Sequence, residues 1–322
     1  MNHHVMAKRA GTEPAASESG FAEAVIEGLS ADTKTLPCRF FYDAIGSELF
    51  EQITQVPEYY PTRTEAALLE RSATGISART RAGTVLIEFG SGSSRKTEIL
   101  LAQMPQLAAY VPIDVSGDAL REAQARLAQR FPALDVLPVV GDFGADLHLP
   151  RHLAHAPRLG FFPGSTIGNL VPAHAQELLA QMGRQLDGGR LIVGVDLRKD
   201  LAVLVPAYND AAGVTAAFNL NLLTRINREL GGDFDLRAFR HDAVWNGDEG
   251  RIEMHLVSRK RQDVHLLGHV FAFTEGERIH TENSYKYSLE GFRRVAEGAG
   301  WRVTSVWTDE RQWFSLQELS RG

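Results

Sequence analysis

The chain has little of several features that define whole classes of protein. Its 322 residues include one cysteine, Cys38, which excludes an intrachain disulfide and a metal cluster held by several cysteines, and which fits a reducing cytoplasm. The 34 basic residues are outnumbered by 40 acidic ones, so a broad surface for nucleic acid is not expected. No stretch reaches the roughly 18 consecutive apolar residues of a membrane span. Small molecules are therefore the expected partners.

Common catalytic motifs are also missing. The sequence contains no H-E-x-x-H, no G-x-S-x-G and no phosphate-binding P-loop, and its 11 histidines are scattered, so no metal site is expected. Residues 1–19 have no apolar run typical of a signal peptide and are expected to form a disordered leader outside the fold. The 44% hydrophobic content is enough for the core of one large or two ordinary domains.

What the chain does have is a regular alternation of strand and helix patterns. Short apolar runs at 84–90, 108–116, 135–143, 158–166 and 188–197 alternate with helical stretches, which is typical of βαβ units in a parallel sheet. Two final runs, at 301–309 and 312–319, predict a hairpin with an antiparallel edge. Residues 201–287 break the rhythm with a long helix and separate strands.

These patterns predict an α/β protein with a doubly wound, Rossmann-like core. We expect the core to comprise residues 64–196 and 288–322, and an α+β lobe to be inserted at 197–287, joined by residues 20–63. Ligands of open parallel sheets bind at the carboxyl ends of the strands. The residues at those ends are therefore the first candidates for a binding site.

Glycines and acids stand at the ends of three consecutive predicted strands. Gly90 and Gly92 follow the first strand, where a tight turn and the close approach of a ligand both favour residues without a side chain. Asp114 ends the second strand and could accept hydrogen bonds from ribose hydroxyls. Asp142 and Phe143, after the third strand, could take the amino group and the ring face of an adenine.

The loop after the first strand departs from the dinucleotide-binding pattern. Arg95 stands where that pattern has its third glycine, and Glu88 lies two residues before Gly90. This arrangement is closer to the acidic-x-Gly-x-Gly loop of methyltransferases that bind S-adenosylmethionine. Binding of NAD remains the alternative.

Polar and aromatic residues near the predicted lobe are candidates for a substrate site. Asn169 follows the fourth strand, where its amide either offers donors and an acceptor to a ligand or caps a turn. Tyr42 and Tyr59 lie in an aromatic-rich stretch, for which ordinary packing is the alternative. Glu282 and Ser284 are two residues apart on a predicted strand and therefore share one face, unless Glu282 only forms a surface salt bridge.

With these stretches side by side, the chain resembles the L-histidine Nα-methyltransferases of ergothioneine biosynthesis, a branch of the S-adenosylmethionine-dependent methyltransferases. The resemblance runs from about residue 40 to the C-terminus in eight collinear motifs. These motifs are FYDAIGSELFEQITQVPEYYPTRTE, EFGSGSSRKTEILL, YVPIDVS, GDF, GSTIGNL, AYNDAAGVTAAFNLNLLTRINREL, EMHLVS and TENSYKYS.

The resemblance implies a two-lobed enzyme with a class I methyltransferase core that trimethylates the α-amino group of L-histidine to give hercynine. It implies that Asn169 and Tyr208 hold the amino and carboxylate groups of the substrate, with Tyr42 close by as a further catalytic residue. The residues implied around the imidazole and in the substrate site are Tyr59, Met254, Glu282 and Ser284. The residues implied for S-adenosylmethionine are Gly90, Lys96, Asp114, Asp142 and Phe143, beside Gly92 of the same loop.

A neutral imidazole has one N–H donor and one bare acceptor nitrogen, so an acid and a hydroxyl on one strand face would satisfy both. Asn283 and Tyr285 fall on the other face and are expected to affect the site little. Three alternatives stay open: a methyltransferase of this branch that acts on another amino acid, an NAD(P)-dependent oxidoreductase, and a non-catalytic S-adenosylmethionine sensor. We expect a cytoplasmic monomer that binds neither nucleic acid nor membrane.

Overall fold

A computed structural model describes residues 16–92, 94–143 and 149–321. Its strands are β1 Val85–Phe89, β2 Ala109–Asp114, β3 Asp135–Val136, β4 Val139–Val140, β5 Arg158–Phe162, β6 Arg190–Asp196, β7 Phe239–Asn246, β8 Arg251–Ser258, β9 Gln262–Leu266, β10 His269–Phe273, β11 Arg278–Tyr285, β12 Trp301–Thr308 and β13 Phe314–Arg321. Its α-helices are α1 Ala16–Ser30, α2 Ala44–Ile53, α3 Tyr60–Ala78, α4 Thr97–Gln103, α5 Gly117–Arg130, α6 Pro172–Leu186, α7 Leu201–Tyr208, α8 Val214–Leu230 and α9 Leu289–Gly298. The 3-10 helices are η1 Cys38–Phe41, η2 Arg151–Leu153, η3 Thr166–Asn169 and η4 Leu236–Ala238.

The larger of the sheets is the predicted doubly wound one. Its strand order is β12-β13-β6-β5-β1-β2-β3, and β4 also pairs with β2. The neighbours from β6 to β3 are parallel, whereas β13 is antiparallel to both β6 and β12, as the predicted terminal hairpin requires. The order reverses beside β1, because the chain runs out through β2 and returns to β5 on its other side. That reversal is where ligands of such sheets bind.

Two predicted details differ from the structure. The run at 135–143 is not one strand: β3 and β4 are two short strands that pair with opposite ends of β2, and Pro138 between them interrupts the pattern because proline lacks an N–H for the ladder. The expected leader is also shorter than predicted, because α1 begins at Ala16. The rest of that leader lies outside the described residues.

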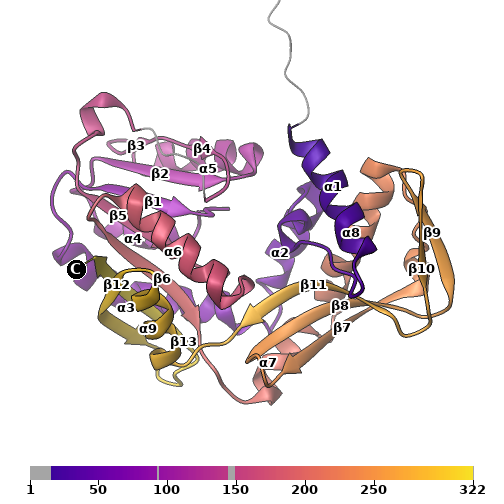
Figure 1. Ribbon diagram of the computed structural model, residues 1–322. Helices are drawn as coiled ribbons and strands as arrows, with labels where there is room; N and C mark the ends of the chain where they lie inside the picture. The colour runs from indigo at the N-terminus through magenta and orange to yellow at the C-terminus, as the bar shows by residue number, and fades with distance from the viewer. Residues whose placement is uncertain (1–15, 93, 144–148, 322) are drawn as a thin grey trace, which may run out of the picture.

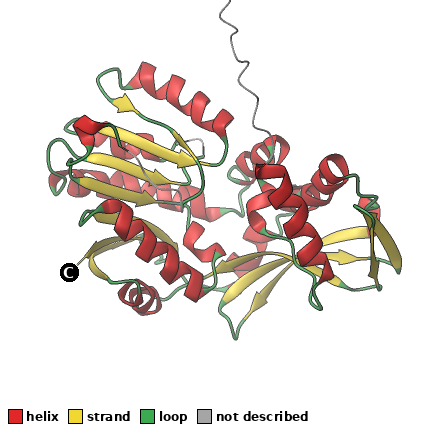
Figure 2. Ribbon diagram, turned by 45° about the horizontal axis from the view of Figure 1, so that its top comes forward, coloured by secondary structure: helices red, strands yellow, loops and turns green. Residues whose placement is uncertain are grey.

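Helices cover both faces of this sheet (Figure 2). Alternate residues of β1 point to opposite sides, as a strand requires: Val85, Ile87 and Phe89 pack in one apolar cluster with α6 and α9, whereas Leu86 packs in another with α3 and α4. No helix of the described ranges is long and apolar enough to cross a membrane.

A second body of structure lies beside the larger sheet (Figure 1). Its three-stranded antiparallel sheet has the order β11-β8-β7, with the β9-β10 hairpin next to it. One apolar cluster joins these strands to α1, η1, α2, α7 and α8, so residues from 21 to 60 and from 204 to 279 pack together. We call the residues of this cluster and its strands the lobe.

The chain crosses between the lobe and the larger sheet at three places. It enters α3 at Tyr60, leaves β6 after Asp196, and returns after β11 through Lys286 and Tyr287. The last two crossings lie side by side, since the amide of Tyr287 donates to the carbonyl oxygen of Asp196 at 3.1 Å. The expected boundary between residues 63 and 64 falls inside the first turn of α3.

One glycine of β6 makes room for a buried acid. Glu65 on α3 is fully buried, and a Cβ added at Gly194 would lie 2.1 Å from its Oε1 and 3.2 Å from the Phe314 ring. A carboxylate held in that position is fixed between a helix and the sheet and cannot move aside without losing its partners. Gly194 is therefore required by close packing rather than by backbone conformation.

We expect Gly194→Ala to lower the free energy of unfolding by about 1–3 kcal/mol, the usual effect of overpacking a filled core. Urea denaturation of both proteins measures the difference. Gly20→Ala is the matched control, because a Cβ there meets nothing within 4 Å and alanine favours the helix. An unchanged midpoint for Gly194→Ala would mean that Glu65 is not held where the structure places it.

Candidate active site

The glycine loop after β1 folds around the carboxylate of Asp114. The Gly92 amide donates to Asp114 Oδ2 at 2.8 Å, and the Ser116 amide donates to Oδ1 at 2.9 Å. Gly90 and Gly92 both have positive φ angles, 74° and 47°, which glycine adopts without strain. Each carboxylate oxygen can accept a second hydrogen bond, so Asp114 keeps acceptor capacity for a pair of ribose hydroxyls.

Phe143 lies directly against this loop. A Cβ added at Gly90 would be 2.9 Å from the Phe143 ring, and the ring packs edge-on against Phe162 with centroids 5.4 Å apart. Because Gly90 has no side chain, the Phe143 ring can lie against the end of β1. Asp142, one residue before Phe143, is exposed. These glycines, acids and the phenyl ring fit a nucleoside at the carboxyl edge of the sheet.

Lys96 stands at the start of α4 on the same edge. Its Nζ lies 2.5 Å from Oε2 of the buried Glu65, whose carboxylate also accepts the Gly164 amide at 2.9 and 3.0 Å. Glu65 therefore connects the loop after β1 to the loop after β5. Sequence reasoning missed Glu65, since a glutamate inside a helical pattern resembles any solvated acid.

On the lobe side, three side chains meet in a buried group of hydrogen bonds. The Tyr208 hydroxyl at the end of α7 lies 2.7 Å from Ser284 Oγ on β11, and Lys286 Nζ donates to both, at 2.7 and 2.6 Å. All three are buried. The structure thus brings Tyr208 and Ser284 into direct contact, with a lysine that sequence reasoning did not single out.

Strand β11 changes register just before the predicted acid. Residues up to His280 pair regularly with β8, and after a bulge at Thr281 the pairing resumes with Glu282 opposite Met254. The Thr281 hydroxyl donates to the Met254 carbonyl oxygen at 3.0 Å and fixes the bulge. Beyond it, Glu282 and Ser284 follow the ordinary alternation and share one face. Tyr285 faces the other way, where its hydroxyl accepts from Arg251.

Glu282 is half-buried. Its carboxyl loses its proton at a higher pH than that of an ordinary glutamate. Burial raises the pKa of its carboxyl to about 7, and the Lys286 ammonium acts in the opposite direction. Among the described residues, no side chain or amide forms a hydrogen bond with this carboxylate. Because its carboxylate has no hydrogen-bond partner within the described residues, its lone pairs are free to accept from a ligand.

The tyrosines form an aromatic group next to Glu282. Tyr59 packs edge-on against Tyr208 with centroids 6.3 Å apart, and Tyr42 packs edge-on against Phe50 at 5.6 Å. Burial raises the pKa values of Tyr42, Tyr59 and Tyr208 well above the usual value, and Glu282 adds to the increase in each.

Acids of both the lobe and the larger sheet affect the pKa of Tyr42. The carboxylates of Glu282 and Asp114 both contribute to raising the Tyr42 pKa, after burial itself. Its hydroxyl therefore lies within electrostatic reach of an acid on the lobe and an acid on the larger sheet.

Asn169 ends η3, which follows β5 and contacts β11. A Cβ added at Gly168 would lie 2.8 Å from the Tyr285 carbonyl oxygen, so the 3-10 turn packs closely against the strand. Asn169 itself is half-buried. Its backbone position connects the carboxyl edge of the larger sheet to the strand that carries Glu282 and Ser284.

Behind the site, one buried carboxylate holds the crossings together. Asp196 accepts from the Tyr60 hydroxyl at 2.9 and 2.7 Å, from Lys199 at 2.5 Å and from Lys286 at 2.8 Å. Burial opposes its ionisation, but the ammonium groups of Lys286 and Lys199 outweigh burial and keep the Asp196 pKa below its usual value. Burial lowers the pKa of Lys199 to about 8. We call these four residues the Asp196 cluster.

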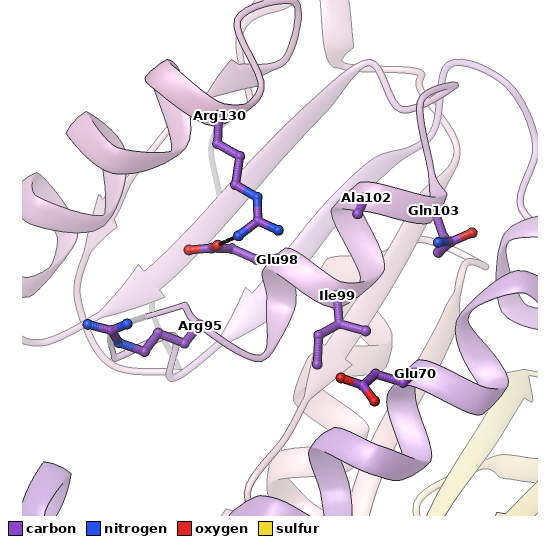
Figure 3. Close-up of a pocket in the computed structure, with 7 residues that line it drawn as sticks. All are labelled: Glu70, Arg95, Glu98, Ile99, Ala102, Gln103 and Arg130. Atoms are coloured by element: carbon purple, nitrogen blue, oxygen red, sulfur yellow. Dashed lines mark hydrogen bonds and ion pairs between the residues drawn. The ribbon is translucent and has the colours of Figure 1, made fainter.

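A hollow lies apart from the site. This hollow, between α3, α4 and α5, is lined by Glu70, Arg95, Glu98, Ile99, Ala102, Gln103 and Arg130. Figure 3 shows Arg130 bonded to Glu98 there, and Arg126 pairs with the same acid at 2.7 Å, so charges in this hollow are matched. Within the described ranges, no group of three or more His, Cys, Asp or Glu side chains is arranged to hold a metal ion.

The strand order with its antiparallel β13, and the glycine loop facing an acid at the end of β2, define an S-adenosylmethionine-dependent methyltransferase of class I. A family model described as a histidine-specific, S-adenosylmethionine-dependent methyltransferase matches residues 21–321. The chain belongs to that family.

Two bacterial relatives match over nearly their whole length. The chain is 47% identical to a histidine N-alpha-methyltransferase of Mycolicibacterium smegmatis over 295 residues, which are 90% of this chain and 91% of the relative. It is 43% identical to a histidine N-alpha-methyltransferase of Mycobacterium tuberculosis over 302 residues, 91% and 92% of the two chains. It is also 29% identical, over 288 residues, to the ergothioneine biosynthesis protein 1 of Neurospora crassa, covering 85% of this chain and 32% of that protein.

We expect Asp114→Asn to weaken binding of S-adenosylmethionine about 10- to 100-fold, because charged hydrogen bonds to the ribose contribute roughly 1.5–3 kcal/mol. Isothermal titration calorimetry measures the dissociation constant without turnover. Asp118→Asn is the control, since Asp118 lies exposed on α5 and pairs with Arg121. Equal affinities in the two variants would remove Asp114 from the cofactor site.

Proposed function

We propose that this chain catalyses the S-adenosylmethionine-dependent trimethylation of the α-amino group of L-histidine to hercynine, a step of ergothioneine biosynthesis. The observation that carries the substrate assignment is the unpartnered Glu282 carboxylate beside the Ser284 hydroxyl on one face of β11. Family membership supports the reaction type.

In this proposal the imidazole lies between Glu282 and Ser284. The carboxylate accepts the imidazole N–H and the serine hydroxyl donates to the bare nitrogen. Tyr59 and Met254 line the same space, Met254 being directly opposite Glu282 in the β8 pairing. Asn169 and Tyr208 hold the amino and carboxylate groups, so that the amine points towards the larger sheet and Tyr42.

The cofactor is assigned to the opposite side. Gly90, Gly92, Asp114, Asp142 and Phe143 would hold the nucleoside, and Lys96 would lie beside it. Bound there, S-adenosylmethionine supplies an electrophilic methyl group on a sulfonium. The lobe and the larger sheet then contribute mainly by holding the amine in line with that methyl, which is a positional advantage.

The tyrosines act as hydrogen-bond donors rather than bases. Burial raises the pKa values of Tyr42, Tyr59 and Tyr208, so all three stay protonated near neutral pH. A phenol that resists ionisation orients the substrate amine and does not remove its proton. The proton of each successive ammonium therefore leaves through water, and the aromatic faces of Tyr42 and Tyr59 favour the growing cation by cation–π attraction.

The proposal assigns cofactor binding and substrate binding to different parts of the chain. We propose that residues 64–196 and 288–322 form the cofactor-binding core and that 20–63 and 197–287 form the substrate-binding lobe. A cytoplasmic monomer that binds neither nucleic acid nor membrane remains part of the proposal, supported by the acidic composition and the lone cysteine. Methylation of another amino acid is the second candidate, and the Glu282–Ser284 pair favours imidazole over indole, which has no acceptor nitrogen.

The reaction is tested with purified protein, S-adenosylmethionine and each of the twenty amino acids, scored by mass spectrometry. We expect three added methyl groups on histidine alone. Three methyls on tryptophan or tyrosine instead would keep the fold and cofactor but overturn the imidazole assignment. Cofactor binding without any methylation would favour a non-catalytic sensor.

Glu282→Gln tests the acid through the pH dependence of KM for histidine. Burial raises the Glu282 pKa to about 7 by disfavouring its charged form, whereas a bound N–H donor favours that form. Binding then releases a proton below about pH 7, so KM should rise by up to about tenfold for each pH unit that the pH falls. This contribution is absent from Glu282→Gln.

The substrate's own imidazole and amine titrate equally with both proteins, so the difference in slope between wild type and Glu282→Gln isolates the enzyme carboxyl. Glu275→Gln, an exposed acid on the turn before β11, serves as the control and should match wild type. Parallel slopes for wild type and Glu282→Gln from pH 5.5 to 8 would show that Glu282 does not contact the imidazole.

A further inference from the structure

Lys286 is a fully buried lysine directly after the end of β11. It lies two residues beyond Ser284 and four beyond Glu282, so all three share the face that follows the bulge. Its side chain is 0% exposed. A buried ammonium group is destabilising unless each of its N–H groups has an acceptor.

Each N–H of Lys286 does have an acceptor. An ammonium group has three donors and no acceptor capacity, and Lys286 Nζ contacts Asp196 Oδ2 at 2.8 Å, the Tyr208 hydroxyl at 2.7 Å and Ser284 Oγ at 2.6 Å. Both hydroxyl oxygens therefore accept a hydrogen bond from Lys286. The lysine is fully used by groups of the protein and leaves no donor for a substrate.

The bonds from Lys286 restrict where the hydroxyl protons of Tyr208 and Ser284 can point. Tyr208 and Ser284 lie 2.7 Å apart and share one hydrogen bond, in which either can be the donor. The pair has two O–H protons, of which one lies between the oxygens and the other points outward. When Tyr208 donates, Ser284 Oγ has both lone pairs occupied and can act only as a donor, and the one lone pair of the two hydroxyls that stays free lies on Tyr208.

The charges of the Asp196 cluster also indicate that Lys286 acts on Tyr208 and Ser284. Two ammonium groups, Lys199 and Lys286, surround one carboxylate, so Asp196 would remain paired through Lys199 and Tyr60 without Lys286. A second lysine is not needed to neutralise Asp196. Its remaining role lies towards Tyr208 and Ser284, and its charge is also felt at Glu282.

We propose that Lys286 is a positioning residue that, with Tyr208 donating to Ser284, makes Ser284 present a hydrogen-bond donor and no acceptor to the substrate. The proposal rests on the function given above, and it adds a determinant of specificity to that site. Asp196 anchors Lys286, Lys286 and Tyr208 together fill both lone pairs of Ser284, and the outward O–H of Ser284 selects a ring with a bare nitrogen. Without Lys286, the serine could rotate and accept as readily as it donates.

The test uses two ligands that differ only at the acceptor nitrogen: histidine and pyrrolylalanine, in which a C–H replaces the bare nitrogen. Calorimetry on the S-adenosylhomocysteine complex gives the ratio of their dissociation constants. In Lys286→Met we expect this ratio to fall about tenfold relative to wild type, the value of roughly one hydrogen bond. A merely structural role would weaken both ligands equally and leave the ratio unchanged.

Controls separate folding, function and positioning. Lys260→Met makes the same chemical change at an exposed lysine and should preserve the ratio. Binding of S-adenosylhomocysteine reports whether Lys286→Met is folded, and Lys286→Gln, with two N–H groups for three partners, is the second variant and should give a smaller fall. A wild-type ratio in either folded variant overturns the proposal. If wild type itself fails to bind or methylate histidine, the proposed function is at fault instead.

Discussion

The buried Asp196 carboxylate is the interaction on which the arrangement of the molecule depends. It lies at the end of β6 and receives hydrogen bonds from residues at all three crossings: Tyr60 at the first, Lys199 just after the second, and Lys286 at the third. Removing a carboxylate from between two buried ammonium groups would leave uncompensated charge, typically worth 3–5 kcal/mol. One ion cluster thus joins the three crossings between the lobe and the larger sheet.

The fold could be predicted from the sequence because its elements follow local periodicity. The doubly wound order and the antiparallel terminal hairpin were expected from buried strands and amphipathic helices, and both are confirmed. The run at 135–143 was assigned as one strand, which is wrong, because apolar periodicity does not show where prolines remove the ladder N–H groups. Strands β7, β9 and β10 were not predicted, although the glycine turns at Asn246-Gly247 and Leu267-Gly268 mark the ends of β7 and β9.

Only part of the candidate site could be predicted from the sequence. Gly90, Asp114 and Phe143 could be chosen from their place at strand ends, and the resemblance supplied Tyr208, Met254 and Lys96. Their roles in binding stay predictions. Asp196, Lys286 and Glu65 were missed, because a charged residue gives no sequence signal of being buried, and their partners are far away along the chain. Lys286 was within reach, since the two-residue alternation that pairs Glu282 with Ser284 continues to it.

The bulge at Thr281 determines which side chains of β11 share a face with Glu282. Because one extra residue separates the regular pairing of His280 from that of Glu282, the face presented by everything after it depends on the number of residues in β11. A one-residue insertion or deletion there would turn Glu282, Ser284 and Lys286 outward together and bring Asn283 and Tyr285 inward. Point substitutions along this strand would therefore change single side chains of the proposed site, whereas a change in its length would replace all of them in a single event.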